Sequence, residues 1–152
     1  MDTYDGFALI YNRHWGPRYA AAAPETLGPL VMSRIPPSSG VLDLCCGSGQ
    51  ISRGLEDSGF HVTGIDQSTA LIEFAKINSP ESSFSVADAR RFNLPAHFQA
   101  AISLNDSLNP GALSRISPVV LARSSPPLVP EVWGIVKVSG WGQELDEVVG
   151  GG

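Results

Sequence analysis

Two glycines that stand two positions apart, Gly47 and Gly49, are the most informative residues of the sequence for chemistry. They follow an apolar run over residues 40–45 and precede a segment with helical spacing, so they occupy a strand-to-helix turn. Glycine adopts positive φ without steric cost and lets a ligand approach the backbone, while the next helix presents free N–H groups at its start. Such a turn is typical of a ligand-binding loop, although a tight structural turn explains the two glycines equally well.

Asp66 changes the balance between these two interpretations. It stands 19 residues after Gly47, at the end of a second apolar segment. An acid about 20 residues after the glycine turn is typical of nucleotide-binding folds, where it accepts hydrogen bonds from the ribose hydroxyls. Asp66 could instead cap the following helix, but Ser68 is equally suited to that position. The spacing therefore favours a nucleoside-binding site.

Asp43 indicates which nucleoside is bound. It lies just before the glycine turn, where a carboxylate would repel the pyrophosphate of NAD and would suit a cation. S-adenosylmethionine carries an ammonium and a sulfonium group and has no phosphate. The third glycine of the dinucleotide fingerprint is also absent, because position 52 is Ser52. Both facts favour S-adenosylmethionine over NAD, and an NAD-type binding domain is kept as the alternative.

The elements that must position these residues alternate between strand and helix. Apolar runs predict strands over residues 40–45, 60–65, 84–87 and 100–104. Helical spacing predicts helices over residues 2–12, 25–34, 50–58 and 69–78. Ser68 is the expected cap of the last helix, and Pro80 ends it. This alternation implies right-handed βαβ units and hence an α/β fold with a parallel sheet.

Three segments carry a resemblance to a known family. They read VLDLCCGSG over residues 41–49, GIDQS over 64–68 and VADAR over 86–90. In order and spacing they resemble the class I S-adenosylmethionine-dependent methyltransferases, over roughly residues 4–109. The resemblance implies a Rossmann-like parallel sheet, of which about four strands in the order 3-2-1-4 are found here. That is incomplete relative to the family's seven strands, whose order is 3-2-1-4-5-7-6.

The resemblance also implies the residues that bind the cofactor. Asp43 is similar to the acid near the methionyl amino group, and Cys45 stands where the family usually has glycine, which makes the turn less permissive. Asp88 resembles the acid that meets the adenine, and a solvated turn acid beside Arg90 and Arg91 is the alternative. The implied cofactor-binding residues are Asp43, Cys45, Gly47, Gly49, Asp66, Gln67, Asp88, Ala89 and Asn105.

Candidates for contact with the methyl acceptor are Asp106 and Tyr11. Asp106 and its neighbour Asn105 follow the fourth strand, at the edge that faces the substrate in this family, but a plain turn is an equal alternative. Tyr11 belongs to a leader segment that closes over the cofactor in similar enzymes, and simple packing is its alternative role. The sequence assigns no catalytic base and no metal ligands.

Composition bounds the remaining possibilities. The chain has 152 residues, of which 43% are hydrophobic and 16% charged, and its net charge is −5. This composition predicts one folded domain and argues against binding of nucleic acid or an anionic membrane. Adjacent cysteines, Cys45 and Cys46, form neither a disulfide framework nor a metal set, which favours a reducing cytoplasm. The acceptor is expected to be a small molecule, and the oligomeric state is not readable.

The chain divides near residue 109 into a patterned part, residues 1–109, and a tail, residues 110–152. Glycine and proline make up 12 of the 43 tail residues, so we expect an irregular tail, with residues 119–121 and 135–138 as candidate short strands. The tail does not match the rest of the family's fold, and its composition indicates, as a hypothesis, a truncated, frameshifted or otherwise aberrant C-terminus. A fourth strand without a neighbour would be an uncovered edge unless the tail pairs with it. The expected consequences are reduced stability and impaired methyl transfer, with a non-catalytic remnant or interaction module as a further alternative.

Overall fold

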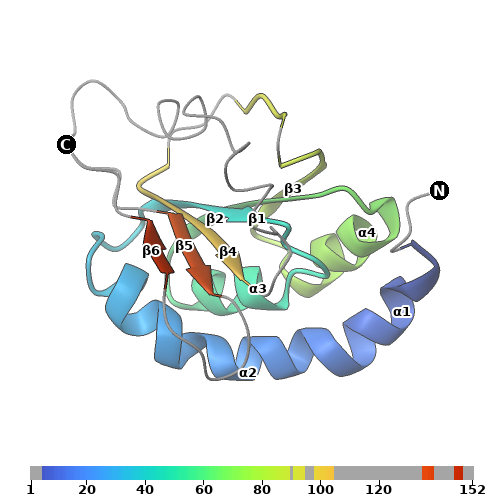
Figure 1. Ribbon diagram of the computed structural model, residues 1–152, viewed down its shortest axis with the longest axis horizontal. Coiled ribbons are helices and arrows are strands. Elements are labelled where there is room, and N and C mark those ends of the chain that lie inside the picture. The colour runs from blue at the N-terminus through green and yellow to red at the C-terminus, as the bar shows by residue number, and fades with distance from the viewer. Residues whose placement is uncertain (1–4, 90, 95–97, 105–134, 139–145, 149–152) are drawn as a thin grey trace.

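The computed structural model describes residues 5–89, 91–94, 98–104, 135–138 and 146–148 (Figure 1). Its helical elements are η1 (Asp5–Phe7), α1 (Ala8–Ile10), η2 (Tyr11–Trp15), α2 (Gly16–Leu27), η3 (Gly28–Met32), α3 (Gln50–Asp57) and α4 (Thr69–Asn78). Its strands are β1 (Gly40–Leu44), β2 (His61–Asp66), β3 (Ser83–Val86), β4 (Ala100–Leu104), β5 (Ile135–Val138) and β6 (Asp146–Val148). The described helices lie on one side of the sheet (Figure 1).

The N-terminal helical elements follow one another without a gap from residue 5 to residue 32. The prediction of two separate helices, over 2–12 and 25–34, is therefore wrong for the residues between them. Gly16 and Pro17 look like a break in the sequence, but proline is tolerated in the first turn of a helix, and Pro17 lies in the first turn of α2. The wider π-helical turn η3 contains Pro29, and η2 ends two residues before Pro17; the backbone lacks a donor N–H at both prolines.

The sheet has six strands in the order β3-β2-β1-β4-β5-β6. The first four are parallel and confirm the predicted order 3-2-1-4. In the register of the sheet, Asp43 of β1 lies between Gly64 of β2 and Ile102 of β4. Because parallel strands end at the same edge, the turn after β1 and the residues that end β2 and β3 are brought together there.

The tail contributes two strands to this sheet. β5, which is the predicted run 135–138, pairs in parallel with β4, and β6 pairs antiparallel with β5. The edge of β4 is therefore covered, which answers the concern about an exposed parallel strand. The other candidate strand, residues 119–121, lies outside the described residues, and a domain boundary near residue 109 remains a prediction.

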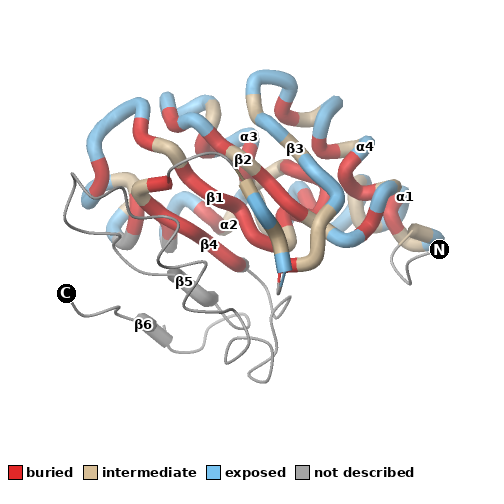
Figure 2. The backbone as a smooth tube through the Cα atoms, turned by 90° about the horizontal axis from the view of Figure 1, so that it is seen from above, coloured by how far each residue is buried: buried red, intermediate tan, exposed pale blue. Residues whose placement is uncertain are grey.

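The sheet separates two groups of buried apolar side chains. Alternate residues of a strand point to opposite faces, so Val41 packs with the helical side and Leu42 with the other side. The first group joins the helices to the sheet and consists of Ala23, Leu27, Val31, Ile35, Val41, Leu55, Phe60, Val62, Ala100 and Ile102. Figure 2 shows β1 buried over most of its length, and residues 41–44 are all buried. This burial holds rigid the strand that carries Asp43.

The start of α4 is capped as the sequence predicts. The Ser68 hydroxyl accepts a hydrogen bond from the backbone N–H of Leu71, at 3.2 Å, and donates to Asp5 Oδ1, at 2.6 Å. We expect Ser68→Ala to lower the free energy of unfolding by about 1–2 kcal/mol, since both bonds are lost at a buried cap. Urea unfolding measures this change. Ser58→Ala, which removes an exposed hydroxyl bonded to the Gly54 carbonyl, is the control and should change stability by no more than about 0.5 kcal/mol.

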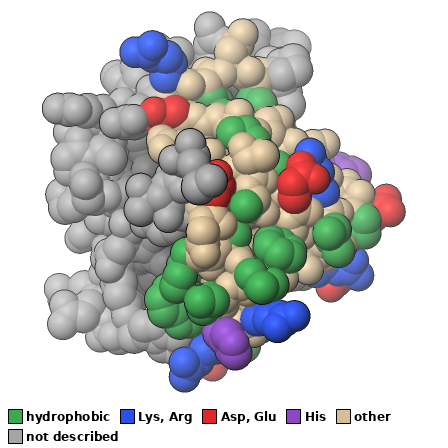
Figure 3. Space-filling model, turned by 90° about the vertical axis from the view of Figure 1, so that its right-hand side faces the viewer, with side chains coloured by type: hydrophobic (Ala, Val, Ile, Leu, Met, Phe, Trp, Pro, Cys, Tyr) green, Lys and Arg blue, Asp and Glu red, His purple; other side chains and the backbone are tan. Residues whose placement is uncertain are grey.

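The outer surface of the N-terminal helix is partly apolar. Leu9 and Ile10 are each 50% exposed, and Ile77 of α4 is 74% exposed. Figure 3 shows apolar side chains gathered on the side of the molecule that carries α1 and α4. In the part of the chain that the structure describes, no helix is both long enough and apolar enough to span a membrane.

Candidate cofactor site

The turn after β1 and the end of β2 are joined by a direct hydrogen bond. The backbone N–H of Gly47 donates to Asp66 Oδ2 at 3.0 Å. The two residues that sequence spacing linked are therefore adjacent in space. The other carboxylate oxygen, Oδ1, accepts from the backbone N–H of Ser68 at 2.9 Å. Since Ser68 rather than Asp66 caps α4, the carboxylate of Asp66 serves to organise the glycine loop.

The backbone of this loop is left-handed at three positions. The φ angles are +57° at Cys45, +57° at Gly47 and +78° at Gly49. Glycine adopts this conformation readily, whereas a side chain there costs roughly 1–2 kcal/mol. Cys45 thus occupies a position that favours glycine, as the comparison with the family predicted. A Cβ atom at Gly49 would lie 2.8 Å from Cα of Ala75, so α4 also requires glycine at this position.

Asp43 is buried at the base of the loop, where it is 2% exposed. Its Oδ2 accepts a hydrogen bond from the Ser52 hydroxyl at 2.7 Å. Burial, which outweighs the opposing effect of this hydrogen bond, raises the pKa of Asp43 to about 7, and the charge of Asp66 adds to the increase. The sequence showed Ser52 only as a missing glycine. Its role as the partner of Asp43 was not foreseen, because the contact depends on how α3 lies against β1.

Three carboxylates, those of Asp43, Asp66 and Asp88, surround the loop, and we call them the acidic cup. Their joint effect is seen at Cys45, whose thiol pKa is raised to about 12 by burial and then by the charges of Asp66, Asp43 and Asp88. In this field a thiolate is disfavoured, so we expect the Cys45 thiol to react slowly with electrophiles. The same field favours a cation.

Tyr11 lies directly against the glycine loop. A Cβ atom at Gly47 would be 2.9 Å from Cε1 and 3.0 Å from the hydroxyl oxygen of Tyr11. Burial, followed by the effects of Tyr19, Asp43 and Asp66, raises the pKa of the Tyr11 hydroxyl well above its ordinary value. The structure therefore brings this predicted residue to the cup. Whether it contacts an acceptor remains a prediction.

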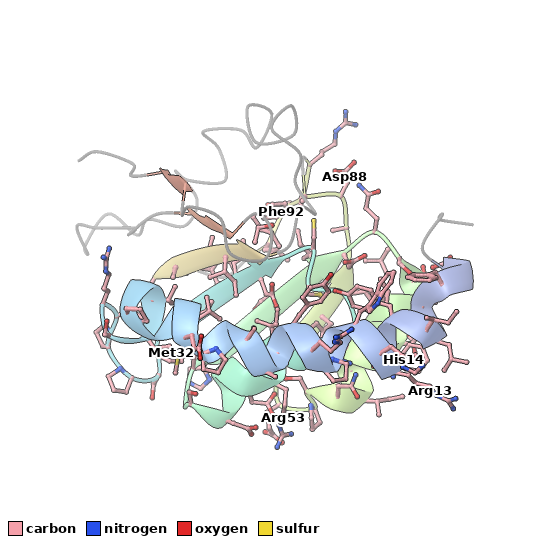
Figure 4. All side chains as sticks on the ribbon, turned by 60° about the horizontal axis from the view of Figure 1, so that its bottom comes forward. Arg13, His14, Met32, Arg53, Asp88 and Phe92 are labelled. Atoms are coloured by element: carbon pink, nitrogen blue, oxygen red, sulfur yellow. The ribbon has the colours of Figure 1, made fainter. Side chains whose placement is uncertain are left out.

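The other predicted residues are placed less favourably or cannot be placed. Gln67 is exposed beside Asp66, and the side chain of Ala89 is buried in the apolar group on the second face of the sheet, so only its backbone is available to a ligand. Asn105 and Asp106 lie outside the described residues. Phe92, which the sequence analysis missed, is half-buried against the same apolar group, and Figure 4 shows it on the same loop as Asp88.

These residues fit a cationic nucleoside. The two phosphates of a dinucleotide would bring negative charge close to the buried carboxylate of Asp43 and to that of Asp66, which is electrostatically unfavourable. An ammonium or sulfonium group placed there would instead be stabilised. Within the residues that the structure describes, no group of three or more His, Cys, Asp or Glu side chains could hold a metal ion.

Comparison with known proteins identifies the family of the chain. A family model described as a methyltransferase domain matches residues 41–119, which is more than half of the chain. The chain belongs to the class I S-adenosylmethionine-dependent methyltransferases. This membership confirms the Rossmann-like α/β fold and S-adenosylmethionine as the cofactor, and it does not favour the NAD alternative.

Individual methyltransferases resemble this one over part of their length. The dTDP-3-amino-3,4,6-trideoxy-alpha-D-glucopyranose N,N-dimethyltransferase of Streptomyces venezuelae is 30% identical over 141 residues, which are 93% of this chain and 58% of that protein. The ubiquinone biosynthesis O-methyltransferase of Xylella fastidiosa is 34% identical over 87 residues, 54% of this chain and 35% of that protein. A TehB-like SAM-dependent methyltransferase from Corynebacterium glutamicum superposes with a TM-score of 0.54 and 29% identity, covering 64% of this chain and 54% of that one. This methyltransferase chain thus spans less than two thirds of the length of each.

Proposed function

We propose that the chain binds S-adenosylmethionine in the acidic cup and supports transfer of its methyl group to a small-molecule acceptor. The observation that carries the proposal is the hydrogen bond from Gly47 to Asp66 beside the buried Asp43, which gathers carboxylates around a left-handed loop. The similar proteins named for a nucleotide sugar and for ubiquinone biosynthesis support a small molecule as the acceptor. They differ in acceptor atom, nitrogen or oxygen, so the proposal does not extend to that choice.

In this proposal the residues of the chain act by binding and orientation. The cofactor, when bound, supplies a methyl group on a sulfonium that is already a good leaving group, so the protein's main task is to align the two reactants. Asp66 is proposed to hold the ribose, Asp43 to face the positive methionyl end and Asp88 to face the adenine. Loop residues Gly47 and Gly49 would allow close approach of the backbone.

Isothermal titration calorimetry with S-adenosylmethionine, S-adenosylhomocysteine and NAD tests the binding step. We expect both sulfur compounds to bind and NAD not to bind. Absence of binding at millimolar S-adenosylmethionine would refute the proposal. A transfer assay with a labelled methyl group on pools of small-molecule acceptors then tests activity, and binding without transfer to any acceptor would instead support the non-catalytic alternative.

The raised pKa of Asp43 predicts a pH dependence of stability. Between its ordinary value, 3.8, and about 7, the folded protein keeps a proton on Asp43 that the unfolded chain has lost. The unfolded state then binds fewer protons, so this group's contribution to stability falls as the pH rises through that range and is constant above it. Urea unfolding between pH 5 and pH 8 measures the trend, and Asp43→Asn should remove this contribution.

The same group predicts a pH dependence of binding. If the cation faces the ionised form of Asp43, the affinity for S-adenosylmethionine should rise with pH by up to about tenfold per pH unit below pH 7 and level off above it. Calorimetry in buffers of different ionisation enthalpy should show a proton released on binding below pH 7. An affinity that does not change between pH 5.5 and pH 8 would contradict the role of Asp43.

A further inference from the structure

Three amide side chains from distant parts of the chain meet beside the glycine loop. They are Asn12 in η2, Gln50 at the start of α3 and Asn78 at the end of α4. The side-chain oxygen of Asn12 accepts from Gln50 Nε2 at 2.7 Å and from Asn78 Nδ2 at 2.7 Å. Gln50 Nε2 also donates to the backbone carbonyl of Asn12 at 3.1 Å. One oxygen atom of the N-terminal segment therefore joins two helices.

The same amides hold the loop itself. Asn78 Nδ2 donates to the backbone carbonyl of Ser48 at 2.7 Å, and the Ser48 hydroxyl donates to Gln50 Oε1 at 2.6 Å. Ser48 is fully buried between the two left-handed glycines. Two polar groups of this one loop residue thus depend on amides that Asn12 fixes in place. Buried polar networks of this kind specify one conformation only when every member is satisfied.

The N-terminal segment makes contacts near the site at three more residues. Asp5 Oδ1 accepts hydrogen bonds from the backbone N–H of Ala70, at 3.2 Å, and from the Ser68 hydroxyl. Ser68 lies two residues after Asp66 in the chain. Tyr11 rests on Gly47, as described above. A side chain at Gly16 would overlap the amide of Gln50, so the segment fits closely against the start of α3. The segment therefore contacts the loop, the start of α3 and the start of α4 at separate residues between Asp5 and Gly16.

We propose that Asn12 is a positioning residue, whose side-chain oxygen couples docking of the N-terminal segment to the conformation of the glycine loop. The coupling rests on the proposed function, in which the loop binds the cofactor. Because coupling between two equilibria is reciprocal, a ligand that needs the ordered loop must also strengthen docking of the segment. Asn12 would then contribute to affinity without any need to touch the ligand.

Two variants test the effect of the Asn12 side-chain oxygen apart from the effect of side-chain volume. Asn12→Leu removes the acceptor at similar volume, whereas Asn12→Asp keeps an acceptor oxygen for both Gln50 and Asn78. His14→Ala changes an exposed residue of the same turn and is the matched control. Figure 4 shows Arg13 on the outer side of the N-terminal helix, where trypsin cleavage reports on docking of the segment.

Binding and protection are measured on the full chain with S-adenosylhomocysteine as the probe. We expect Asn12→Leu to weaken binding about tenfold and to abolish most of the protection of Arg13 that the probe gives the wild type. Asn12→Asp and His14→Ala should stay within about threefold of the wild type in both measurements. That change is smaller than the change in affinity that coupling between two sites typically produces. The inference is overturned if Asn12→Leu lowers the melting temperature but leaves the affinity and the ligand-dependent protection unchanged, which is what a merely structural role would do.

A measurement without ligand keeps this inference separate from the proposed function. Hydrogen exchange of the loop amides over residues 46–50 should be faster in Asn12→Leu than in the wild type, and near wild type in Asn12→Asp. If the wild type binds no S-adenosylhomocysteine, the proposed function fails and the exchange measurement alone decides the role of Asn12. Unchanged exchange in Asn12→Leu then rules that role out.

Discussion

Gly49→Ala is expected to destabilise the protein by about 2–5 kcal/mol. The residue has a φ of +78°, a conformation that costs a side chain roughly 1–2 kcal/mol. The new Cβ would lie 2.8 Å from Cα and 2.9 Å from Cβ of Ala75, so α4 or the loop must shift, and overpacking of this kind costs about 1–3 kcal/mol. Against a total stability of about 5–15 kcal/mol, the expected loss is large. Urea unfolding monitored by circular dichroism measures it.

Gly54→Ala provides the matched control for this substitution. Gly54 lies inside α3, and a Cβ there would have nothing within 4 Å. Alanine in a helix interior is more favourable than glycine by about 1 kcal/mol, so this variant should be more stable than the wild type. Gly47→Ala is expected to fall between the two, since its Cβ would meet the movable ring of Tyr11 rather than backbone. If Gly49→Ala is as stable as Gly54→Ala, the described loop conformation is wrong.

Local signals predicted the central elements because those elements are determined locally. The helix α4 runs over Thr69–Asn78 as predicted, since a serine cap begins it and Pro80 follows its end. The strand β4 also has the predicted bounds. The N-terminal helix could not be predicted in this way, because Gly16 and Pro17 break the local pattern while packing against α3 and the Gln50 side chain maintains the helix. There tertiary contact outweighs local propensity.

In the candidate site too, the contacts set by local spacing could be predicted and those set by tertiary packing could not. The spacing between Gly47 and Asp66 follows from the lengths of one helix and one strand, so it is visible in the sequence and corresponds to a direct hydrogen bond. The contact between Ser52 and Asp43 and the contact between Asn12 and Asn78 depend on how helices lie on the sheet and on each other. Residues 66 positions apart, such as Asn12 and Asn78, carry no local signal of their proximity.

Asp66→Asn is expected to weaken binding of S-adenosylmethionine by about 10- to 100-fold. The carboxylate holds the Gly47 N–H with one oxygen and the Ser68 N–H with the other, so an amide must present an NH₂ group to one of these donors. The substitution therefore removes three things together: the loop contact, the ionic character of the proposed ribose bonds and one charge of the acidic cup. Hydrogen bonds to charged groups contribute about 1.5–3 kcal/mol, which corresponds to the expected range of affinity. Calorimetry at pH 8 measures the change.

Two further measurements separate this effect from unfolding and from a general loss of charge. Glu25→Gln removes the same charge from an exposed position on α2 and should bind like the wild type. In Asp66→Asn the pKa of the Cys45 thiol should fall, because Asp66 is the largest electrostatic contributor to its increase after burial, so alkylation of Cys45 at a fixed pH should be faster. Faster alkylation with an unchanged far-ultraviolet spectrum would show that the protein is folded and that the loss of affinity comes from the changed charge of the acidic cup. A folded Asp66→Asn protein that binds within twofold of the wild type would instead contradict the proposed role of Asp66 in cofactor binding.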